Sequence, residues 1–410
     1  MTATKATQVR VGLFGLFGAG NSGNDASLEA ILGYLRTEHP EAVVDALCGG
    51  PEVITARYGI PAARMNWNRG EYRTASSVVA IATKGLGKLV DAVRTAAWVR
   101  RHDVVIVPGT GVLETTLPLR PWGFPYSLFL LCASGRLLRT RVALVSVGAS
   151  EIGHRATRIL VRWSARLAAY RSFRGAHSRD AIGAMGVATA RDEVYPDLAF
   201  SLPAPRASMP SGPPGPVCVG VMAWHGSNDE RTRAEEIHRR YLDGTIRFVR
   251  ALVEDGRTVR LLTGDELDRP VATAILDAVD SPLVTAAEAA SLGDLMKEAA
   301  AADTVVAARY HNLVCALKVG TPTLAVCYSE KSDDLMALMG LGAYCHSARE
   351  VDGDRLLEQF RELEQRSPEL RRTLPERNRD AARRVEDQFT ALTAALFPPT
   401  GRTRTTREPS

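Results

Sequence analysis

Residues 303–331 read DTVVAARYHNLVCALKVGTPTLAVCYSEK, and their pattern predicts the fold of the whole chain. The apolar run at 304–308 is typical of a buried parallel strand. Apolar residues return at helical spacing over 313–317, and Gly320 ends the predicted helix. A second apolar run at 323–327 predicts another buried strand. The stretch is therefore a strand–helix–strand unit, the building block of a parallel sheet.

Polar and cationic side chains follow both of these strands. Arg309, His311 and Asn312 come directly after the first strand, and Lys331 comes after the second. The carboxyl ends of parallel strands form one edge of a sheet, where ligands bind in open α/β folds. Because a helix N-terminus lies among these groups, the favoured ligand is an anion, most simply a phosphate.

Length and composition are those of an ordinary globular enzyme with two or three cores. The chain has 410 residues, of which 45% are hydrophobic and 24% charged, and its net charge of +5 gives no reason to expect a nucleic-acid partner. Six scattered cysteines are interpreted as reduced thiols, with neither a zinc motif nor a disulfide framework. We therefore expect no cofactor and no dependence on divalent ions.

The N-terminal residues contain no apolar signal core, and the longest apolar run, 126–133, is too short to span a bilayer. We therefore expect a cytoplasmic protein. A predicted amphipathic helix at 154–169 carries arginines every three or four residues. These arginines form either a solvated face or a surface for an anionic membrane, which would place the protein at the inner face of the membrane.

A glycine-rich turn follows the first predicted strand, Val9 to Phe14. Its Gly18–Gly23 segment fits a dinucleotide fingerprint, but Asp25 places a carboxylate where a pyrophosphate would lie. Nicotinamide or flavin binding is therefore disfavoured. Asn21, Asn24 and Asp25 either cap the turn and helix or face a polyhydroxylated, proton-exchanging ligand.

A second glycine-rich loop, Pro108 to Gly111, follows the predicted strand at 103–107 and leads to Glu114. Six prolines in the fifteen residues 202–216 cannot form regular structure, and the strand–helix alternation restarts after them. Two such alternations predict two Rossmann-like domains that face one cleft, with the proline-rich segment as hinge. The expected divisions are a first domain at 1–200, a linker at 201–216, a second domain at 217–350, a helical region at 351–397 and a disordered tail at 398–410.

These residues together resemble the polysaccharide pyruvyl transferase family. The matching patterns are Gly15-Leu-Phe-Gly18-Ala-Gly-Asn21-Ser-Gly-Asn24-Asp25, Arg174-x-x-x-Ser178 with Asp197-Leu-Ala-Phe200, and Arg309-x-His311 with Gly320-x-Pro322, Tyr328 and Lys331. The resemblance implies a fold similar to that of two-domain GT-B glycosyltransferases. It also implies transfer of pyruvate from phosphoenolpyruvate to sugar hydroxyls of a glycan or glycolipid, as a ketal, with release of phosphate.

The resemblance places donor binding on Arg174, His311 and Lys331, so phosphoenolpyruvate would lie on the side of the second domain and the acceptor on that of the first. The family's usual Arg-Asp pair reads Arg174-Gly175 here, so Arg179-Asp180 could be the functional pair instead. Phosphoenolpyruvate carries about three negative charges, which arginine and lysine neutralise well.

Ketal formation requires an acid, a base and a phosphate cradle. His311 would protonate or steady the leaving phosphate, since a bound dianion favours its imidazolium form. Asp25 is the candidate base and Glu114 the reserve. We expect Arg309, Asn21 and Asn24 to contact substrate as well.

Two other functions remain open. A nucleotide-sugar glycosyltransferase on the same scaffold would use the cationic groups for a diphosphate, and a non-catalytic binder of carbohydrates or anions would need no acid–base pair. The sequence does not name the acceptor sugar, the hydroxyls bridged, the ketal stereochemistry or the oligomeric state.

Overall fold

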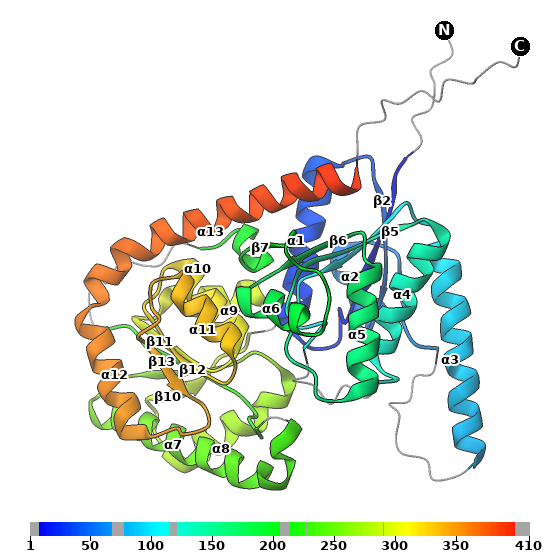
Figure 1. The fold of residues 1–410 in the computed structure, drawn as a ribbon. Coiled ribbons are helices and arrows are strands. Elements are labelled where there is room, and N and C mark those ends of the chain that lie inside the picture. Colours follow the sequence, from blue (N-terminus) through cyan, green and yellow to red (C-terminus); the bar gives the residue numbers. More distant parts are fainter. Residues whose placement is uncertain are drawn as a thin grey trace, which may run out of the picture.

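The computed structural model describes residues 8–67, 78–114, 121–205, 214–226, 228–289 and 291–397, and it contains two α/β domains, each built on a parallel sheet (Figure 1). Neighbouring residues of a central strand of the first sheet, such as Ile106 and Val107, belong to two separate hydrophobic cores. Both faces of this sheet are therefore buried, as parallel sheets require.

The first sheet has seven strands in the order β3-β2-β1-β4-β5-β6-β7. Its strands are β1 (Arg10–Gly15), β2 (Val43–Cys48), β3 (Ala62–Arg64), β4 (Val104–Pro108), β5 (Arg141–Val147), β6 (Tyr170–Phe173) and β7 (Glu193–Val194). The helices are α1 (Ser22–Glu38), α2 (Pro51–Tyr58), α3 (Val78–Val99), α4 (Phe124–Leu138), α5 (Arg155–Leu167) and α6 (Ala176–Ala184), and the short 3₁₀ helix η1 (Leu198–Ser201) closes the domain.

The second sheet has six strands in the order β10-β9-β8-β11-β12-β13. Its strands are β8 (Val217–Val221), β9 (Val259–Thr263), β10 (Val284–Ala286), β11 (Thr304–Ala307), β12 (Thr323–Cys327) and β13 (Cys345–Ser347). The helices are α7 (Ala234–Glu254), α8 (Arg269–Val279), α9 (Leu292–Ala301), α10 (Tyr310–Val319) and α11 (Glu330–Leu338), with 3₁₀ turns η2 (Asn228–Arg233) and η3 (Glu266–Asp268).

Both sheets follow the doubly wound strand order, in which the direction of winding reverses between two central strands. The reversal falls between β1 and β4 in the first domain and between β8 and β11 in the second. Loops that leave the carboxyl ends of such strands diverge and form a ligand crevice. The loops after β1, β4 and β11 are therefore placed to build a site.

The C-terminal helices connect the two domains. Helix α12 (Gly353–Gln365) packs on α7 of the second domain, whereas α13 (Ser367–Leu396) runs across both domains (Figure 1). At its far end, α13 enters the first domain through buried Gln388, whose amide hydrogen-bonds to Ser146 and Ser172. The last helix thus fixes one domain against the other.

Several elements differ from the sequence prediction. Lys331, which was predicted only to follow the second strand, lies in the first turn of helix α11, because this helix begins at Glu330 with Ser329 as its N-cap. The centre of the predicted proline-rich linker, 206–213, and the predicted tail from 398 lie outside the described residues.

Candidate functional site

Glu114 lies at the centre of a buried charge cluster between the two domains. It follows the loop after β4, and its side chain is 5% exposed. Arg174 Nη2 of the first domain donates to Glu114 Oε1 at 2.5 Å, and Lys331 Nζ of the second donates to Oε2 at 2.8 Å. One carboxylate thus holds a cation from each domain.

Aromatic rings surround the two cations. The Arg174 guanidinium lies 4.6 Å from the centroid of the Tyr310 ring, and Lys331 Nζ lies 5.8 Å from the same ring and 5.2 Å from that of Tyr328. Arg174 Nη1 also approaches Asp197 Oδ2 at 3.5 Å. Rings packed against cations exclude water and strengthen the electrostatic field in the site.

The cluster is charged at neutral pH. Burial alone would raise the pKa of Glu114, but Lys331 and Arg174 overcome that effect and lower it to about 2. Burial would likewise lower the pKa of Lys331, yet the Glu114 carboxylate more than compensates and raises it. The site therefore combines two buried cations, Arg174 and Lys331, with two carboxylates, Glu114 and Asp197.

His311 lies beside this cluster in the first turn of α10. Burial is the main reason that its pKa falls to about 4, so the imidazole is neutral at physiological pH. Among the described residues nothing hydrogen-bonds to its Nε2. Its ring packs directly on Gly23, where an added Cβ would lie 2.0 Å from His311 Nδ1 and Cε1. A glycine is thus needed where the N-terminus of α1 meets the second domain.

Other buried polar atoms of the region also have no hydrogen-bond partner within the described ranges. They are Arg174 Nε, Asn312 Nδ2 and Oδ1, Ser329 Oγ, Ser332 Oγ and Asp334 Oδ2. Buried polar atoms are normally paired, so these atoms are candidates for contact with a polar ligand. Ser329 and Ser332 flank Lys331 at the N-terminus of α11, where the helix dipole favours an anion, although the first turn also carries Glu330 and Asp333.

The three predicted residues of the β1–α1 turn are held by local bonds. Asn21 is the N-cap of α1 and accepts from the backbone of Gly23 and Asn24, while Asn24 Nδ2 donates to Leu16 O at 3.3 Å. Asp25 Oδ1 accepts from Gly18 N at 2.8 Å, and Arg57 lies 3.7 Å from its Oδ2. Burial raises the pKa of Asp25.

This turn also contacts the second domain. Asn21 Nδ2 lies 3.4 Å from Asp265 Oδ2, and Ser22 Oγ donates to Gly264 O at 3.3 Å. Together with the contact of Gly23 and His311, these bonds place the N-terminus of α1 against the carboxyl edge of the second sheet.

The two other predicted arginines lie apart from the Glu114 cluster. Arg309 makes a two-pronged ion pair with fully buried Asp268, at 2.6 and 2.8 Å, which fixes the entrance of α10. Arg179 is exposed and pairs with neighbouring Asp180 at 3.3 Å. Of the two alternative arginines, Arg174 is therefore the one that the fold brings to Glu114, Lys331 and His311.

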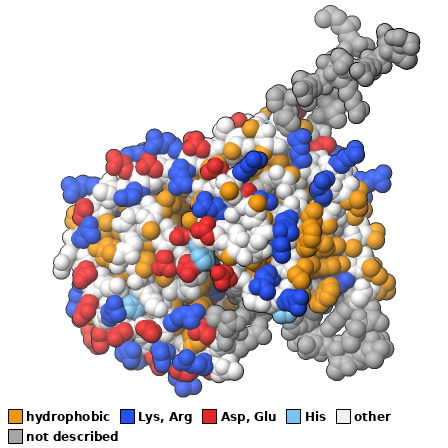
Figure 2. All heavy atoms as spheres, in the orientation of Figure 1, with side chains coloured by type: hydrophobic (Ala, Val, Ile, Leu, Met, Phe, Trp, Pro, Cys, Tyr) orange, Lys and Arg blue, Asp and Glu red, His pale blue; other side chains and the backbone are white. Residues whose placement is uncertain are grey.

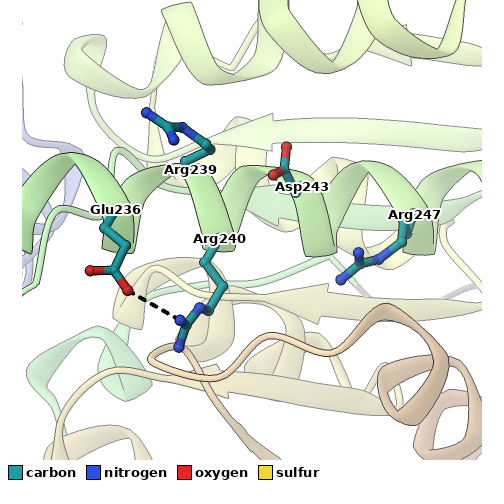
Figure 3. Close-up of a pocket in the computed structure, with 5 residues that line it drawn as sticks. All are labelled: Glu236, Arg239, Arg240, Asp243 and Arg247. Atoms are coloured by element: carbon teal, nitrogen blue, oxygen red, sulfur yellow. Dashed lines mark hydrogen bonds and ion pairs between the residues drawn. The ribbon is translucent and has the colours of Figure 1, made fainter.

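A separate surface hollow lies on the outside of α7, away from the strand ends. It is lined by Glu236, Arg239, Arg240, Asp243 and Arg247, with Glu236 paired to Arg240 at 3.2 Å (Figure 3). These side chains are spaced along one exposed helix face. They form a solvated charged surface.

The sequence patterns did not single out Tyr310, Ser329, Ser332 or Asp334. Ser329 and Ser332 had a visible signal, since they flank Lys331 directly after a predicted strand. Tyr310 had no such signal, because its contact with Arg174 depends on the packing of two domains.

Comparison with known families identifies the chain. Residues 21–330 match the model of the family described as polysaccharide pyruvyl transferase, a range that includes Asn21, Glu114, Arg174 and His311 and ends one residue before Lys331. The chain belongs to the polysaccharide pyruvyl transferase family. No curated protein sequence matches it. As a member of this family the protein is a transferase acting on polysaccharides.

Solved structures confirm the predicted GT-B-like fold of this pyruvyl transferase family member. UDP-GlcNAc 2-epimerase from Neisseria meningitidis is 11% identical with a TM-score of 0.56, over 95% of this chain and 99% of that one. MurG from Acinetobacter baumannii is 11% identical with a TM-score of 0.55, over 93% and 99%. The lipopolysaccharide outer core galactosyltransferase WaaB is 12% identical with a TM-score of 0.56, over 95% and 99%. At these identities the likeness concerns the fold alone.

Proposed function

We propose that this protein transfers pyruvate from phosphoenolpyruvate to two hydroxyls of a sugar, forming a ketal and releasing phosphate. The observation that carries the proposal is the convergence of Arg174 and Lys331 on Glu114, beside a buried His311 with an unpartnered Nε2. Family membership supports the same chemistry.

The donor is a compact trianion at neutral pH, and the cluster suits its two charged ends. Lys331 and the N-terminus of α11, with Ser329 and Ser332, would bind the phosphate, because these groups supply a cation, backbone N–H donors and two orphaned hydroxyls. Arg174 would bind the carboxylate through its orphaned Nε. Glu114 holds both cations in place until the donor arrives.

The reaction needs four proton movements: two protons leave the sugar hydroxyls, one reaches C3 and one reaches the leaving phosphate. C3 of the enol gains a proton and becomes the methyl group, while the first sugar hydroxyl loses its proton and attacks C2. The C2–O bond to phosphate then breaks, and the second hydroxyl attacks C2 and loses its proton. The products are one ketal and one inorganic phosphate for each donor and diol.

These movements assign roles to three side chains. His311 is neutral before the donor binds, and an adjacent phosphate dianion would favour its protonation, so it would donate to the leaving phosphate. Asp25 would accept the proton of the attacking hydroxyl, and its raised pKa suits a base. Glu114 is the alternative base. Asn21 and Asn24 would then line the acceptor side, and Arg309 would support the donor side through its pair with Asp268.

Incubation with phosphoenolpyruvate and a panel of nitrophenyl and lipid-linked sugars tests the proposal. We expect an acceptor to gain the mass of one pyruvic acid less one water, with an equal amount of phosphate released. A UDP-sugar offered in place of phosphoenolpyruvate would yield product only if the protein were a glycosyltransferase. Phosphate release without acceptor modification, or neither product with any acceptor, would contradict the transferase proposal.

We further propose that the first domain rests on the anionic inner face of the membrane. Helices α3, α4 and α5 pack side by side and expose large apolar side chains, and Figure 2 shows such side chains gathered on this domain beside cationic ones. The exposed residues are Leu86, Leu89, Val93, Trp122, Leu137, Ile159 and Trp163, and α5 adds exposed Arg155, Arg158 and Arg166. Within the described ranges no helix is long and apolar enough to cross a bilayer.

Apolar side chains that enter the interface, together with arginines that attract anionic lipid at about 1 kcal/mol each, are typical of peripheral docking. Sedimentation with phosphatidylglycerol and with phosphatidylcholine vesicles tests it. We expect binding to the anionic vesicles, weakened by salt and by Leu137→Glu or Arg158→Glu. Leu267→Glu, which changes a 71% exposed leucine of the second domain, is the control. Equal binding of all variants would contradict membrane docking by this face.

A further inference from the structure

A cluster of two thiols and a carboxylate lies outside the charge cluster described above. Cys327 ends β12, Cys345 begins the neighbouring β13, and Asp333 lies in α11. Their Sγ and carboxylate oxygen atoms all lie within 4.8 Å of one another. No metal motif is visible in the sequence, because the three residues come from two strands and a helix and converge only in the fold.

Strand register explains the convergence. Ala325 pairs with Cys345 and Cys327 pairs with Ser347, so the two cysteines lie on the same side of adjacent strands, two residues out of register. Residues two apart on a strand point to the same face. The first turn of α11 then passes over this edge and brings Asp333 to the thiols.

We propose that Cys327, Cys345 and Asp333 bind a zinc-like divalent cation. Zinc prefers thiolate, imidazole and carboxylate ligands at tetrahedral angles, and bonds of about 2.3 Å place two thiolates roughly 3.8 Å apart. The observed spacing is compatible with that geometry. Three protein ligands leave a fourth position for water.

The environment separates these thiols from the others in the chain. Cys48, Cys132, Cys218 and Cys315 are buried, whereas Cys327 and Cys345 are partly exposed and Asp333 is exposed. A metal can therefore reach the cluster from solvent. In the metal-free protein a hydrogen bond with Cys345, together with burial, raises the pKa of Cys327. Binding of the cation would displace these protons, as is usual for cysteine sites.

The site would act on the donor cluster by positioning. Asp333 lies two residues after Lys331 in the same helical turn, and Cys327 directly precedes Tyr328, whose ring contacts Lys331. A cation that joins Cys327 and Asp333 would close the segment between them into a short loop. It would thereby fix the backbone that carries Lys331 and Ser329.

Titration of the full-length, phosphine-reduced protein with Co²⁺ and then Zn²⁺ tests the proposal. We expect one Co²⁺ per chain, with the thiolate charge-transfer and visible bands of a tetrahedral sulfur site, and displacement of these bands by Zn²⁺. Cys327→Ser and Cys345→Ser should lose the charge-transfer band, and Asp333→Asn should weaken binding. Cys132→Ala removes a thiol from the first domain and should leave the spectrum unchanged.

Thermal unfolding with Zn²⁺ or a chelator provides a second measurement. The melting temperature of the parent should rise with Zn²⁺, and that of Cys345→Ser should not. The proposal is overturned by an absence of stoichiometric Co²⁺ binding, by a spectrum that survives both serine substitutions, or by a mass that shows Cys327 and Cys345 joined as a disulfide under these conditions.

Discussion

The Glu114 carboxylate accepts a hydrogen bond from Lys331 Nζ at 2.8 Å, although 217 residues separate the two in the chain. Glu114 belongs to the first domain and Lys331 to the second, and Arg174 shares the same carboxylate. Both ion pairs are buried. The charge of the Glu114 side chain therefore affects how the two domains are held relative to each other. A bound anion would take over part of this pairing.

Glu114→Gln should destabilise the protein by roughly 3–5 kcal/mol at neutral pH, since it leaves two buried cations with less compensation. The pKa of Glu114 is about 2 in the folded protein and 4.5 ordinarily. Its contribution is thus fully present above pH 4.5 and is lost as the pH falls through about 2. Urea unfolding of parent and variant, from neutral pH down to about pH 3, should show a constant difference that begins to shrink below pH 4.5. A difference that grows on acidification would contradict the account.

Gly23→Ala should disrupt the packing between the two domains, because the added Cβ would lie 2.0 Å from the His311 ring. We expect a higher KM for phosphoenolpyruvate, lower turnover and a lower melting temperature. Gly33→Ala on the same helix is the control, since an added Cβ there meets no described atom within 4 Å. It should leave activity unchanged and stabilise α1 by roughly 0.5–1 kcal/mol. Equal effects of both changes would show that His311 does not pack on Gly23.

The fold could be predicted from the sequence because buried parallel strands appear there as continuous apolar runs. The strands at 104–108 and 323–327 were each predicted to within one residue. Short edge strands such as β10 and β13, with three residues each, give no such signal. Helix α3 was not predicted, because Gly85 and Gly87 interrupt its helical pattern.

The sequence predicted three of the residues that converge in the structure, His311, Lys331 and Glu114, because each follows the end of a predicted strand. Pairing across the domains was not readable, because it depends on how two sheets face each other. Arg309 shows why position after a strand is not sufficient to predict a ligand contact. Its place after β11 predicted such a contact, but its guanidinium pairs with buried Asp268 of η3.

Asp25→Asn tests whether Asp25 acts as a general base or only stabilises the glycine-rich turn through its hydrogen bond with Gly18. The asparagine carbonyl can still accept from Gly18 N, so the glycine-rich turn should keep its shape and α1 its first turn. Phosphoenolpyruvate affinity should be unchanged while turnover falls by about 10²- to 10⁴-fold. Near-parental turnover would show that Asp25 has only the structural role, and Glu114 would become the base to test.

Binding of phosphoenolpyruvate should take up a proton near pH 6, because His311 has a pKa of about 4 in the free protein and a phosphate dianion would raise it. Calorimetry in buffers of different ionisation enthalpy measures this uptake. His311→Gln keeps a hydrogen-bond donor and should abolish the uptake. The same uptake in parent and variant would exclude His311 as the group that is protonated.

Calorimetric titration of the parent and of Lys331→Met with phosphoenolpyruvate and with UDP-GlcNAc tests the donor most directly. We expect the parent to bind phosphoenolpyruvate and not UDP-GlcNAc. Loss of the charge-assisted contact of Lys331 should weaken donor binding by roughly 1.5–3 kcal/mol, about 10- to 150-fold. Binding of UDP-GlcNAc without phosphoenolpyruvate, or undiminished binding of phosphoenolpyruvate by Lys331→Met, would contradict the proposed donor site.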